Sequence, residues 1–301
     1  MTKPRLSVVI PTYQRNDELA RCLDCLAPEV QSLPQEGYEV IVSDDGRAIS
    51  AEEMISQNYP WARWTKGPAR GIGANRNQGA SQANAGWIVF FDSDTLPDPD
   101  CLRVYAKAIE ANPEAIAFEG AILGSGDMDK EWFRCPVNTH GGLFWTANVA
   151  IRTETFRAIG GFDPELVSYH EDREIYERLK QICPVDFLSE AIVIHPARRT
   201  TFRHEVGRIP RRMCDLAYFV KRHGPRIGQP NLGSGLLHGM IFQTRGVWQA
   251  LRIRHYADAF QEFLCLASFP FLFTYFYAKA RPTKNHDPKI SNQATCSVVQ
   301  S

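Results

Sequence analysis

The sequence has 301 residues, of which 44% are hydrophobic and 23% are charged, a composition typical of a soluble globular protein with a hydrophobic core. Its 34 Lys and Arg residues balance its 34 Asp and Glu residues, and a net charge of zero excludes a protein that attracts nucleic acid through its overall charge. The eight cysteines are scattered, so we expect reduced thiols. No signal-peptide pattern precedes the first strand-like segment, and we therefore expect a cytoplasmic protein.

Strand and helix patterns alternate over the first two thirds of the chain. Short β-rich or apolar runs predict strands at 6–10, 39–43, 62–65 and 87–91, and helical spacing or composition predicts helices at 16–26, 73–85 and 100–111. Strands that alternate with helices of this length predict an α/β fold with a mainly parallel, Rossmann-like sheet flanked by helices. We expect residues 1–200 to form this domain.

Polar residues directly follow three of these predicted strands. Pro11-Thr12 follows the first strand, Asp44-Asp45-Gly46 follows the second, and Asp92-Ser93-Asp94 follows the run at 87–91. Ligands in open α/β sheets bind just beyond the carboxyl ends of the strands. We therefore expect these three segments to open onto one ligand-binding cleft.

The triplet Asp92-Ser93-Asp94 is the strongest candidate for chemistry. Two carboxylates two residues apart on a turn can hold a hard divalent cation, and such a cation neutralises charge on a leaving diphosphate. A solvated turn with helix-capping aspartates has the same sequence, but the position after a continuous apolar strand favours the metal site. At Asp44-Asp45-Gly46 a carboxylate can accept hydrogen bonds from a uracil ring or from ribose hydroxyls, although Asp-Gly is also a common turn.

Ser168 and Glu171 have the spacing of a capping box and predict a helix that continues through Leu179. Asp172 then lies in the first turn, where the helix dipole favours the ionised carboxylate. A general base for a sugar hydroxyl requires such an ionised carboxylate. The alternative is that both acids only stabilise the start of the helix.

His195 follows an apolar run and is a candidate metal ligand. An imidazole at this position can complete a metal site with Asp94, or it can be an ordinary residue at the end of a strand. His170, His204 and His223 are rivals, and the residue types alone leave the choice open.

The order of these motifs resembles family 2 of the glycosyltransferases. The matching segments are residues 8–13, 42–46, 74–79, 90–94, 141–142, 160–163 and 171–172. The resemblance extends over residues 5–200. It implies a GT-A fold, a nucleotide-sugar donor, a bound Mn²⁺ or Mg²⁺ ion and inversion at the anomeric carbon.

The resemblance also implies roles for individual residues. The donor-binding residues would be Pro11, Thr12, Tyr13, Asp45, Arg76, Asp92, Ser93 and Gly142. The metal ligands would be Asp94, His195 and Asp92. Trp145 and Glu171 would lie at the acceptor, and Asp172 would be the catalytic base.

The sequence departs from the family pattern at two places. Arg47-Ala48-Ile49 stands where the family has small hydroxylated and acidic residues. The segment 249–253 lacks the tryptophan of the Gln-x-x-Arg-Trp motif of processive members, and no array of membrane-spanning segments is present in the sequence. The missing tryptophan and the lack of such an array favour an enzyme that adds a single sugar. We expect a UDP-sugar as its donor.

The composition changes after residue 200. We expect residues 201–281 to form a basic, mostly helical extension and residues 282–301 to form a disordered polar tail. Residues 264–278 carry no charge and are flanked by cationic groups, yet this run is shorter than the roughly 20 residues that a membrane-spanning helix requires. The pattern favours a segment that lies in a membrane interface, and a helix that caps the core is the alternative.

Two other functions share parts of this pattern. A nucleotidyltransferase also combines an α/β sheet with acidic metal ligands, but it should carry a glycine-rich basic loop where this chain has Pro11-Thr12-Tyr13-Gln14. A catalytically silent, membrane-docked binding module would not need the intact acids at 92–94 and 171–172. We therefore predict a glycosyltransferase in peripheral contact with the inner face of a membrane, acting on a glycan or lipid-linked acceptor and not on nucleic acid.

Overall fold

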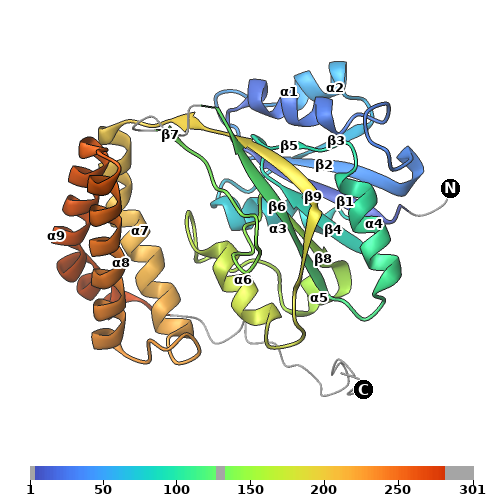
Figure 1. The fold of residues 1–301 in the computed structure, drawn as a ribbon. Coiled ribbons are helices and arrows are strands. Elements are labelled where there is room, and N and C mark those ends of the chain that lie inside the picture. Colours follow the sequence, from blue (N-terminus) through green and yellow to red (C-terminus); the bar gives the residue numbers. More distant parts are fainter. Residues whose placement is uncertain (1–3, 127–132, 282–301) are drawn as a thin grey trace.

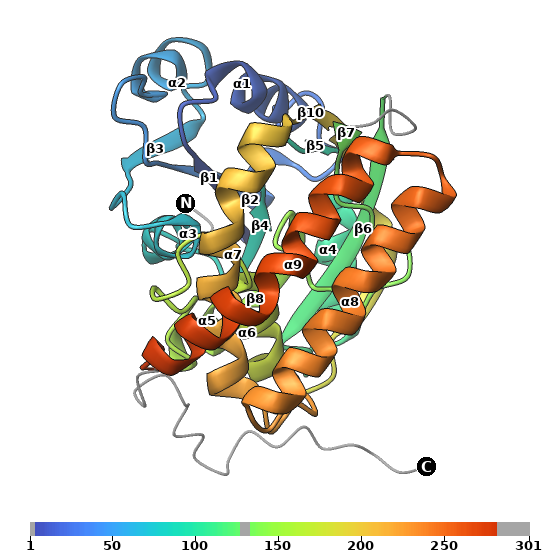
Figure 2. The ribbon, with the colours of Figure 1, turned by 90° about the vertical axis from the view of Figure 1, so that its left-hand side faces the viewer.

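The computed structural model describes residues 4–126 and 133–281, and the predicted tail at 282–301 lies outside these ranges. A curved eight-stranded sheet forms the centre of the larger part of the molecule, and three long helices form a separate layer beside it (Figure 1). Figure 2 looks directly onto this helical layer. The predicted α/β fold with a mostly helical C-terminal region is confirmed.

The N-terminal half of the sheet is parallel. Its strands are β1 (Leu6–Thr12), β2 (Tyr38–Asp44), β3 (Ala62–Lys66) and β4 (Trp87–Phe91), which lie in the order β3-β2-β1-β4. The register places Thr12 opposite Asp44, so β1 and β2 end side by side. The four strands that the sequence patterns predict are all present.

The other half of the sheet is mixed. Its strands are β8 (Asn148–Arg152), antiparallel to β4 and β6; β6 (Ala117–Ser125), parallel to β9; β9 (Asp186–Pro196); and β5 (Leu96–Pro97), antiparallel to β9. A separate two-stranded antiparallel sheet joins β7 (Phe133–Arg134) to β10 (Arg198–Arg199). The sequence AFEGAILGS of β6 has a single β-branched residue, Ile122, so its strand state depends on pairing with β8 and β9 rather than on local propensity.

Helices cover both faces of the sheet, and alternate residues of each strand point to opposite faces. Val8 and Ile10 pack with α1 (Asn16–Cys25), α2 (Glu52–Asn58) and α4 (Cys101–Ala111), whereas Val9 packs with α3 (Ile72–Ser81), α5 (Thr153–Ala158) and α6 (Glu171–Leu179). Burial on both faces explains why the run at 87–91 is continuously apolar.

Helix α3 is shorter than predicted and ends at Ser81 instead of residue 85. The backbone N–H of Asn84 donates to Glu39 Oε1 (2.7 Å), and the backbone N–H of Ala85 donates to Ser7 Oγ (3.0 Å). These side-chain acceptors on β1 and β2 replace the carbonyls of a preceding helical turn, so the chain leaves the helix.

Helix α6 begins at Glu171, but the predicted capping box is wrong. The residue before the helix, His170, has a left-handed backbone with φ 65°, and no side chain caps the helix start. The backbone N–H groups of Ser168 and Tyr169 instead both donate to Oδ2 of Asp215 at 3.0 Å. Asp215 lies on α7, so a carboxylate from the helical layer organises the chain that enters α6.

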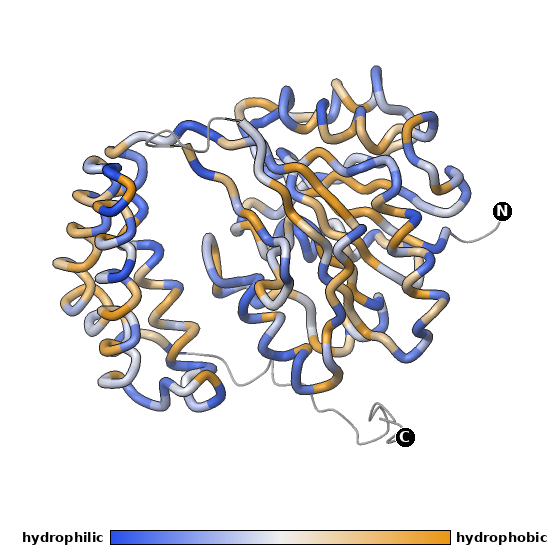
Figure 3. The backbone as a smooth tube through the Cα atoms, in the orientation of Figure 1, coloured by the Kyte–Doolittle hydropathy of each residue, from blue (hydrophilic) through white to orange (hydrophobic). Residues whose placement is uncertain are grey.

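The helical layer consists of α7 (Phe202–His223), α8 (Leu232–Arg252) and α9 (Tyr256–Lys279), which share a core of their own. The predicted apolar run at 264–278 lies within α9, which has 24 residues. By length and composition α9 is the one helix in the described ranges that could cross a membrane, and 28% of its apolar window is buried in the structure. Figure 3 shows hydrophobic residues along the strands of the sheet and also along α8 and α9.

Candidate active site

Three strand ends meet at one edge of the sheet. The backbone N–H of Asp45 donates to the carbonyl of Thr12 (3.0 Å), which ties the end of β2 to the end of β1. After β4, the N–H and the hydroxyl of Thr95 both donate to the carbonyl of Asp92 (3.1 and 2.8 Å). This tight turn holds Asp92 and Asp94 at the sheet edge, as expected from the sequence.

A cavity of about 570 Å³ opens at this edge, and we call it the donor cavity because predicted donor-binding residues line it. The predicted site residues that line it are Pro11, Thr12, Tyr13, Asp45, Asp92, Ser93 and Asp94. Its walls also contain residues that were not predicted to belong to the site, namely Arg15, Asn75, Ser168, Arg198, Arg208 and Arg211. Three of these arginines lie in the basic stretch after β9, where no local motif distinguishes a site residue from a solvated charge.

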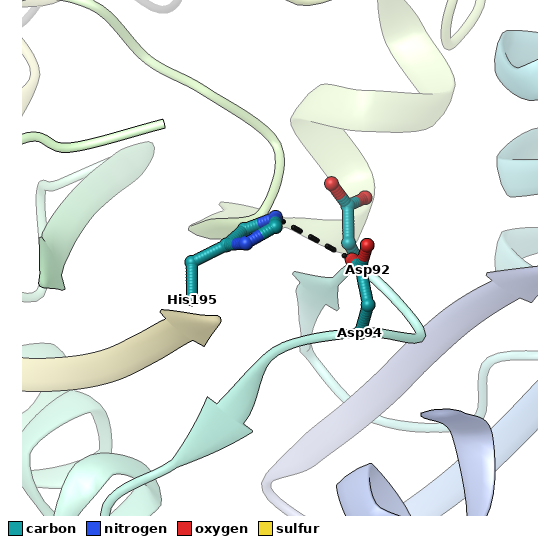
Figure 4. Close-up of side chains that lie close together, drawn as sticks. All are labelled: Asp92, Asp94 and His195. Atoms are coloured by element: carbon teal, nitrogen blue, oxygen red, sulfur yellow. Dashed lines mark ion pairs between the residues drawn. The ribbon is translucent and has the colours of Figure 1, made fainter. Parts of the chain in front are cut away.

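Asp92, Asp94 and His195 form a compact cluster at the donor cavity. Each offers one ligand atom, and these atoms all lie within 4.8 Å of one another. His195 Nε2 is 3.5 Å from Asp94 Oδ1 (Figure 4). The parallel pairing of β9 with β6 carries His195 to this edge of the sheet from a position about 100 residues further along the chain.

The electrostatics of this cluster match a divalent cation. Burial and the neighbouring charge of Asp92 raise the pKa of the Asp94 carboxyl above its ordinary range. Arg198 Nη1 and Arg15 Nη1 lie 2.7 and 3.1 Å from Asp94 Oδ2, so cationic groups already offset part of this charge. Two carboxylates and an imidazole are a donor set that suits Mn²⁺ or Mg²⁺, and the residues therefore fit the metal that the family resemblance implies.

Arg76, a predicted donor-binding residue, is 1% exposed and does not line the donor cavity. Its Nη2 contacts Asp92 Oδ1 at 2.6 Å and its Nη1 contacts Glu171 Oε1 at 2.9 Å. The guanidinium thus joins the turn after β4 to the start of α6. Arg76 and Glu171 were expected to touch substrates, whereas their side chains in this structure bind each other.

Asp172 is the second residue of α6 and is half-buried. The backbone N–H of Arg173 donates to its Oδ1 (2.6 Å). Burial and the adjacent charge of Glu171 raise the pKa of Asp172 to about 7. We expected the start of the helix to lower the pKa of Asp172, and this expectation is wrong. The loss of solvation on burial raises the pKa by more than the helix dipole lowers it. A carboxyl that titrates near pH 7 is well suited to proton transfer.

Gly142 and Trp145 lie in the segment before β8, outside the walls of the donor cavity. The N–H groups of Gly142 and Leu143 donate to the two carboxylate oxygens of Glu119 at 2.6 and 3.0 Å. Gly142 has φ 85°, a left-handed conformation that glycine adopts without strain. Trp145 is half-buried against the sheet core. Glu119, which the sequence patterns did not single out, is therefore the residue that shapes this segment.

The model of the family described as "Glycosyl transferase family 2" matches residues 7–160. The chain belongs to this family. Among curated relatives, the validoxylamine A glucosyltransferase of Streptomyces hygroscopicus subsp. jinggangensis is 26% identical over 263 residues, which cover 73% of this chain and 61% of that protein. The chain spans about three fifths of the length of the curated relatives that it matches first.

The similarity to solved structures covers more of the chain than the family match does. The mannosyltransferase PcManGT from Pyrobaculum calidifontis, in complex with GDP-Man and Mn²⁺, has a TM-score of 0.58 at 18% identity and covers 90% of this chain and 88% of its own. TarS 1–349 from S. aureus, in complex with UDP-GlcNAc, has a TM-score of 0.54 at 16% identity, with coverages of 88% and 91%. The expected GT-A-type fold is confirmed.

Proposed function

We propose that this chain transfers a single sugar from a nucleotide-diphosphate sugar, a UDP-sugar in our assignment, to a hydroxyl group of an acceptor with inversion at the anomeric carbon. The observation that carries the proposal is the cluster of Asp92, Asp94 and His195 at a cavity whose other wall holds the predicted nucleoside-binding residues. Family membership supports the reaction class, and the UDP-GlcNAc and GDP-Man bound by the similar structures support a nucleotide-sugar donor.

The nucleoside would bind between the ends of β1 and β2. Tyr13 is 56% exposed and lines the donor cavity, so its ring offers a surface on which a base can stack. The Oδ1 of Asp45 accepts a hydrogen bond from the N–H of Ala69 (2.6 Å), and its second oxygen can accept from the ribose or the base.

Asp94, His195 and Asp92 would hold a divalent ion, which supplies positive charge against the negative charge that develops on the leaving diphosphate. Arg15 and Arg198 contact the same carboxylate of Asp94 and add fixed positive charge at this end of the cavity. Such preorganised charge stabilises a transition state in which the bond to the diphosphate breaks.

Asp172 would accept the proton of the acceptor hydroxyl. The hydroxyl oxygen forms a bond to the anomeric carbon from the face opposite the diphosphate, the bond to the diphosphate breaks, and the proton remains on the Asp172 carboxyl. The ion pairs of Arg76 with Asp92 and Glu171 fix the distance between the turn after β4 and the helix that carries Asp172. Trp145 and Glu171 remain our candidates for contact with the acceptor.

The acceptor would be a glycan or a lipid-linked glycan near the inner face of a membrane. Helices α8 and α9 carry large exposed apolar side chains, among them Met240, Ile241 and Trp248, which lie together around one pocket of α8, and Phe271 of α9. We call this surface the α8–α9 face. Arg252 ends α8, Arg254 lies between α8 and α9, and Lys279 ends α9. Aromatic side chains next to cationic groups favour contact with anionic lipid headgroups.

The test is a screen of nucleotide-sugars against the full chain by thermal shift, with and without Mn²⁺, followed by transfer and donor-hydrolysis assays with the ligand that stabilises the chain most. Asp172→Asn should reduce turnover by about 10²- to 10⁴-fold while donor affinity stays the same, because a general base acts only in the chemical step. The matched control is Glu165→Gln, which changes an exposed carboxylate in the segment before the same helix. Normal turnover by Asp172→Asn would overturn the assignment.

A further inference from the structure

A second cavity, of about 860 Å³, adjoins the donor cavity, and we call it the arginine cavity. Six arginines line it and Glu205 is the single carboxylate among its lining residues; the arginines are Arg15, Arg134, Arg198, Arg199, Arg208 and Arg211. They come from the residue that precedes α1, from both strands of the β7–β10 sheet and from α7. The fold therefore concentrates positive charge here from segments far apart in the sequence.

Some of these arginines are neutralised and others are not. Arg15 and Arg198 pair with Asp94, Arg134 pairs with Asp258 (2.7 Å), and Arg208 pairs with Glu205 (3.6 Å). Within residues 4–126 and 133–281, Arg199 and Arg211 have no carboxylate at ion-pair distance. Like charges around one cavity repel each other, and an anion bound between them removes this repulsion.

The first turn of α7 adds to the positive potential of the arginine cavity. Thr201 caps this 22-residue helix by accepting a hydrogen bond from the N–H of His204, and Thr201, His204 and Gly207 all line the cavity. A helix N-terminus presents backbone N–H groups and the positive end of the dipole. The guanidinium fork matches the oxygens of a phosphate. The chemistry of the walls thus selects a phosphate ester.

The position of the arginine cavity separates it from the nucleoside site. It shares Arg15, Ser168, Arg198, Arg208 and Arg211 with the donor cavity but none of the residues from the ends of β1 and β2. Ser168 and Tyr169, which line it, belong to the segment that leads into α6 and Asp172. The arginine cavity therefore extends from the diphosphate end of the donor cavity towards the helix that carries the base.

We propose that the arginine cavity binds a phosphate group of the acceptor, so that the acceptor is a phosphate ester with its reacting hydroxyl directed towards Asp172. This assignment rests on the proposed function, since it names the acceptor class of the same site. The phosphate can belong to a water-soluble sugar or polyol phosphate or to a lipid phosphate, and the test below separates the two sources.

The test uses the full chain with UDP and Mn²⁺ bound, so that the donor cavity is filled. Glycerol 3-phosphate and glycerol are titrated by calorimetry at equal ionic strength, and we expect heat of binding from the phosphate ester alone. Arg199→Gln should weaken this binding about tenfold, as loss of one charge-assisted hydrogen bond does. Glu205→Gln should strengthen it, because the change removes the one carboxylate of the cavity wall. Arg21→Gln, an exposed arginine on α1, is the control and should change nothing.

A parallel arm measures binding to vesicles of phosphatidylcholine with and without phosphatidic acid. Retention that depends on phosphatidic acid and on Arg199 assigns the phosphate to a lipid, and its absence assigns it to a soluble ester. Equal binding of glycerol and glycerol 3-phosphate would overturn the proposal. An equal loss of UDP affinity in Arg199→Gln would do so as well, because the arginine would then serve the donor. Absence of UDP binding by the wild-type chain would instead remove the proposed function and leave a phosphate site without an acceptor role.

Discussion

The sheet region and the helical layer differ in what they leave exposed. Helices cover the sheet on both faces, and its apolar residues form two continuous cores. The helical layer buries residues such as Phe269 and Phe273 on one side, whereas Phe242, Trp248 and Phe271 on α8 and α9 are 69%, 67% and 77% exposed. An exposed apolar face of this kind is typical of contact with a membrane or a partner. The two regions are therefore built for different surroundings.

The interface between the two regions is polar. Asp163 Oδ2 accepts hydrogen bonds from Tyr218 (2.9 Å) and Arg222 (3.1 Å) of α7, and Glu174 of α6 lies 3.1 Å from His223 Nε2. Together with the two backbone bonds to Asp215, these contacts attach α7 to the helix that carries Asp172. The helical layer thus positions the proposed base as well as forming one wall of the arginine cavity.

The largest expected effect is on this interface. Glu174→Ala leaves Arg178 buried without its carboxylate, and removal of one partner of a buried pair costs about 3–5 kcal/mol of unfolding free energy. Chemical denaturation measures the loss, and Glu165→Ala, at an exposed position before α6, is the control, with a change within about 0.5 kcal/mol. Burial raises the pKa of Glu174, but the hydrogen bond from His223 and the charge of Arg178 outweigh it and lower the pKa to about 2. The part of the unfolding free energy that the ionised Glu174 gives the wild type over Glu174→Ala should therefore disappear as pH falls from about 4.5 to about 2.

A smaller effect is expected at the metal cluster. In Asp94→Ala, Mn²⁺ should no longer strengthen donor binding, and affinity in Mn²⁺ should fall by more than the roughly 10- to 100-fold that loss of an indirect metal contact causes. Calorimetric titration of the nucleotide-sugar with and without Mn²⁺ measures both quantities. Asp100→Ala removes a nearby exposed carboxylate that pairs with Arg103 and should leave both unchanged. Full Mn²⁺ dependence in Asp94→Ala would assign the metal to other residues.

Sequence patterns located the strands that end at the donor cavity and the carboxylates that follow them, because both features are encoded by residues that are neighbours along the chain. The apolar run of β4 and the triplet after it are local, and both were predicted correctly as a strand and a strand end. The start of α6 was not, since its organising acceptor is Asp215, more than 40 residues further along. The ion pair between Arg76 and Glu171 could not be predicted, because the two residues are 95 positions apart and only the fold brings them together. Their contacts with substrates stay predictions. The arginine cavity is assembled from four separate segments, and no local pattern could indicate it.

The pH dependence of transfer should follow the carboxyl of Asp172. Its pKa of about 7 lies above the ordinary value of 3.8, so the proposed base is protonated below pH 7 and the rate should fall about tenfold per pH unit there. The raised pKa also means that the folded state binds this proton more tightly than the unfolded state. Ionisation therefore costs stability as pH rises from about 4 to about 7. Asp172→Asn should be more stable than the wild type at pH 8, and the difference should shrink towards pH 4. A difference that stays constant with pH would show that Asp172 is not the titrating group.

The smallest expected effect on the fold comes from the exposed face of α9. Phe271→Ser should change the unfolding free energy by no more than about 0.5 kcal/mol, because the ring is 77% exposed. Phe269→Ser, two residues away and fully buried, should cost about 3–5 kcal/mol. Binding to vesicles of phosphatidylcholine and phosphatidylglycerol, measured by sedimentation, should fall about tenfold in Phe271→Ser, since burial of a phenylalanine ring contributes more than 1.4 kcal/mol.

Point substitution tests this face better than truncation does, because removal of the chain from residue 264 would also remove Phe269 and Phe273 from the core of the helical layer. The vesicle experiment distinguishes a membrane-facing surface from one that a protein partner covers. If Phe271→Ser binds vesicles as strongly as the wild type, while Arg252→Gln also has no effect, the α8–α9 face does not contact lipid. The contrast between the two regions would then require a protein to cover these aromatic side chains, and the helical layer would position Asp172 without bringing it to a membrane.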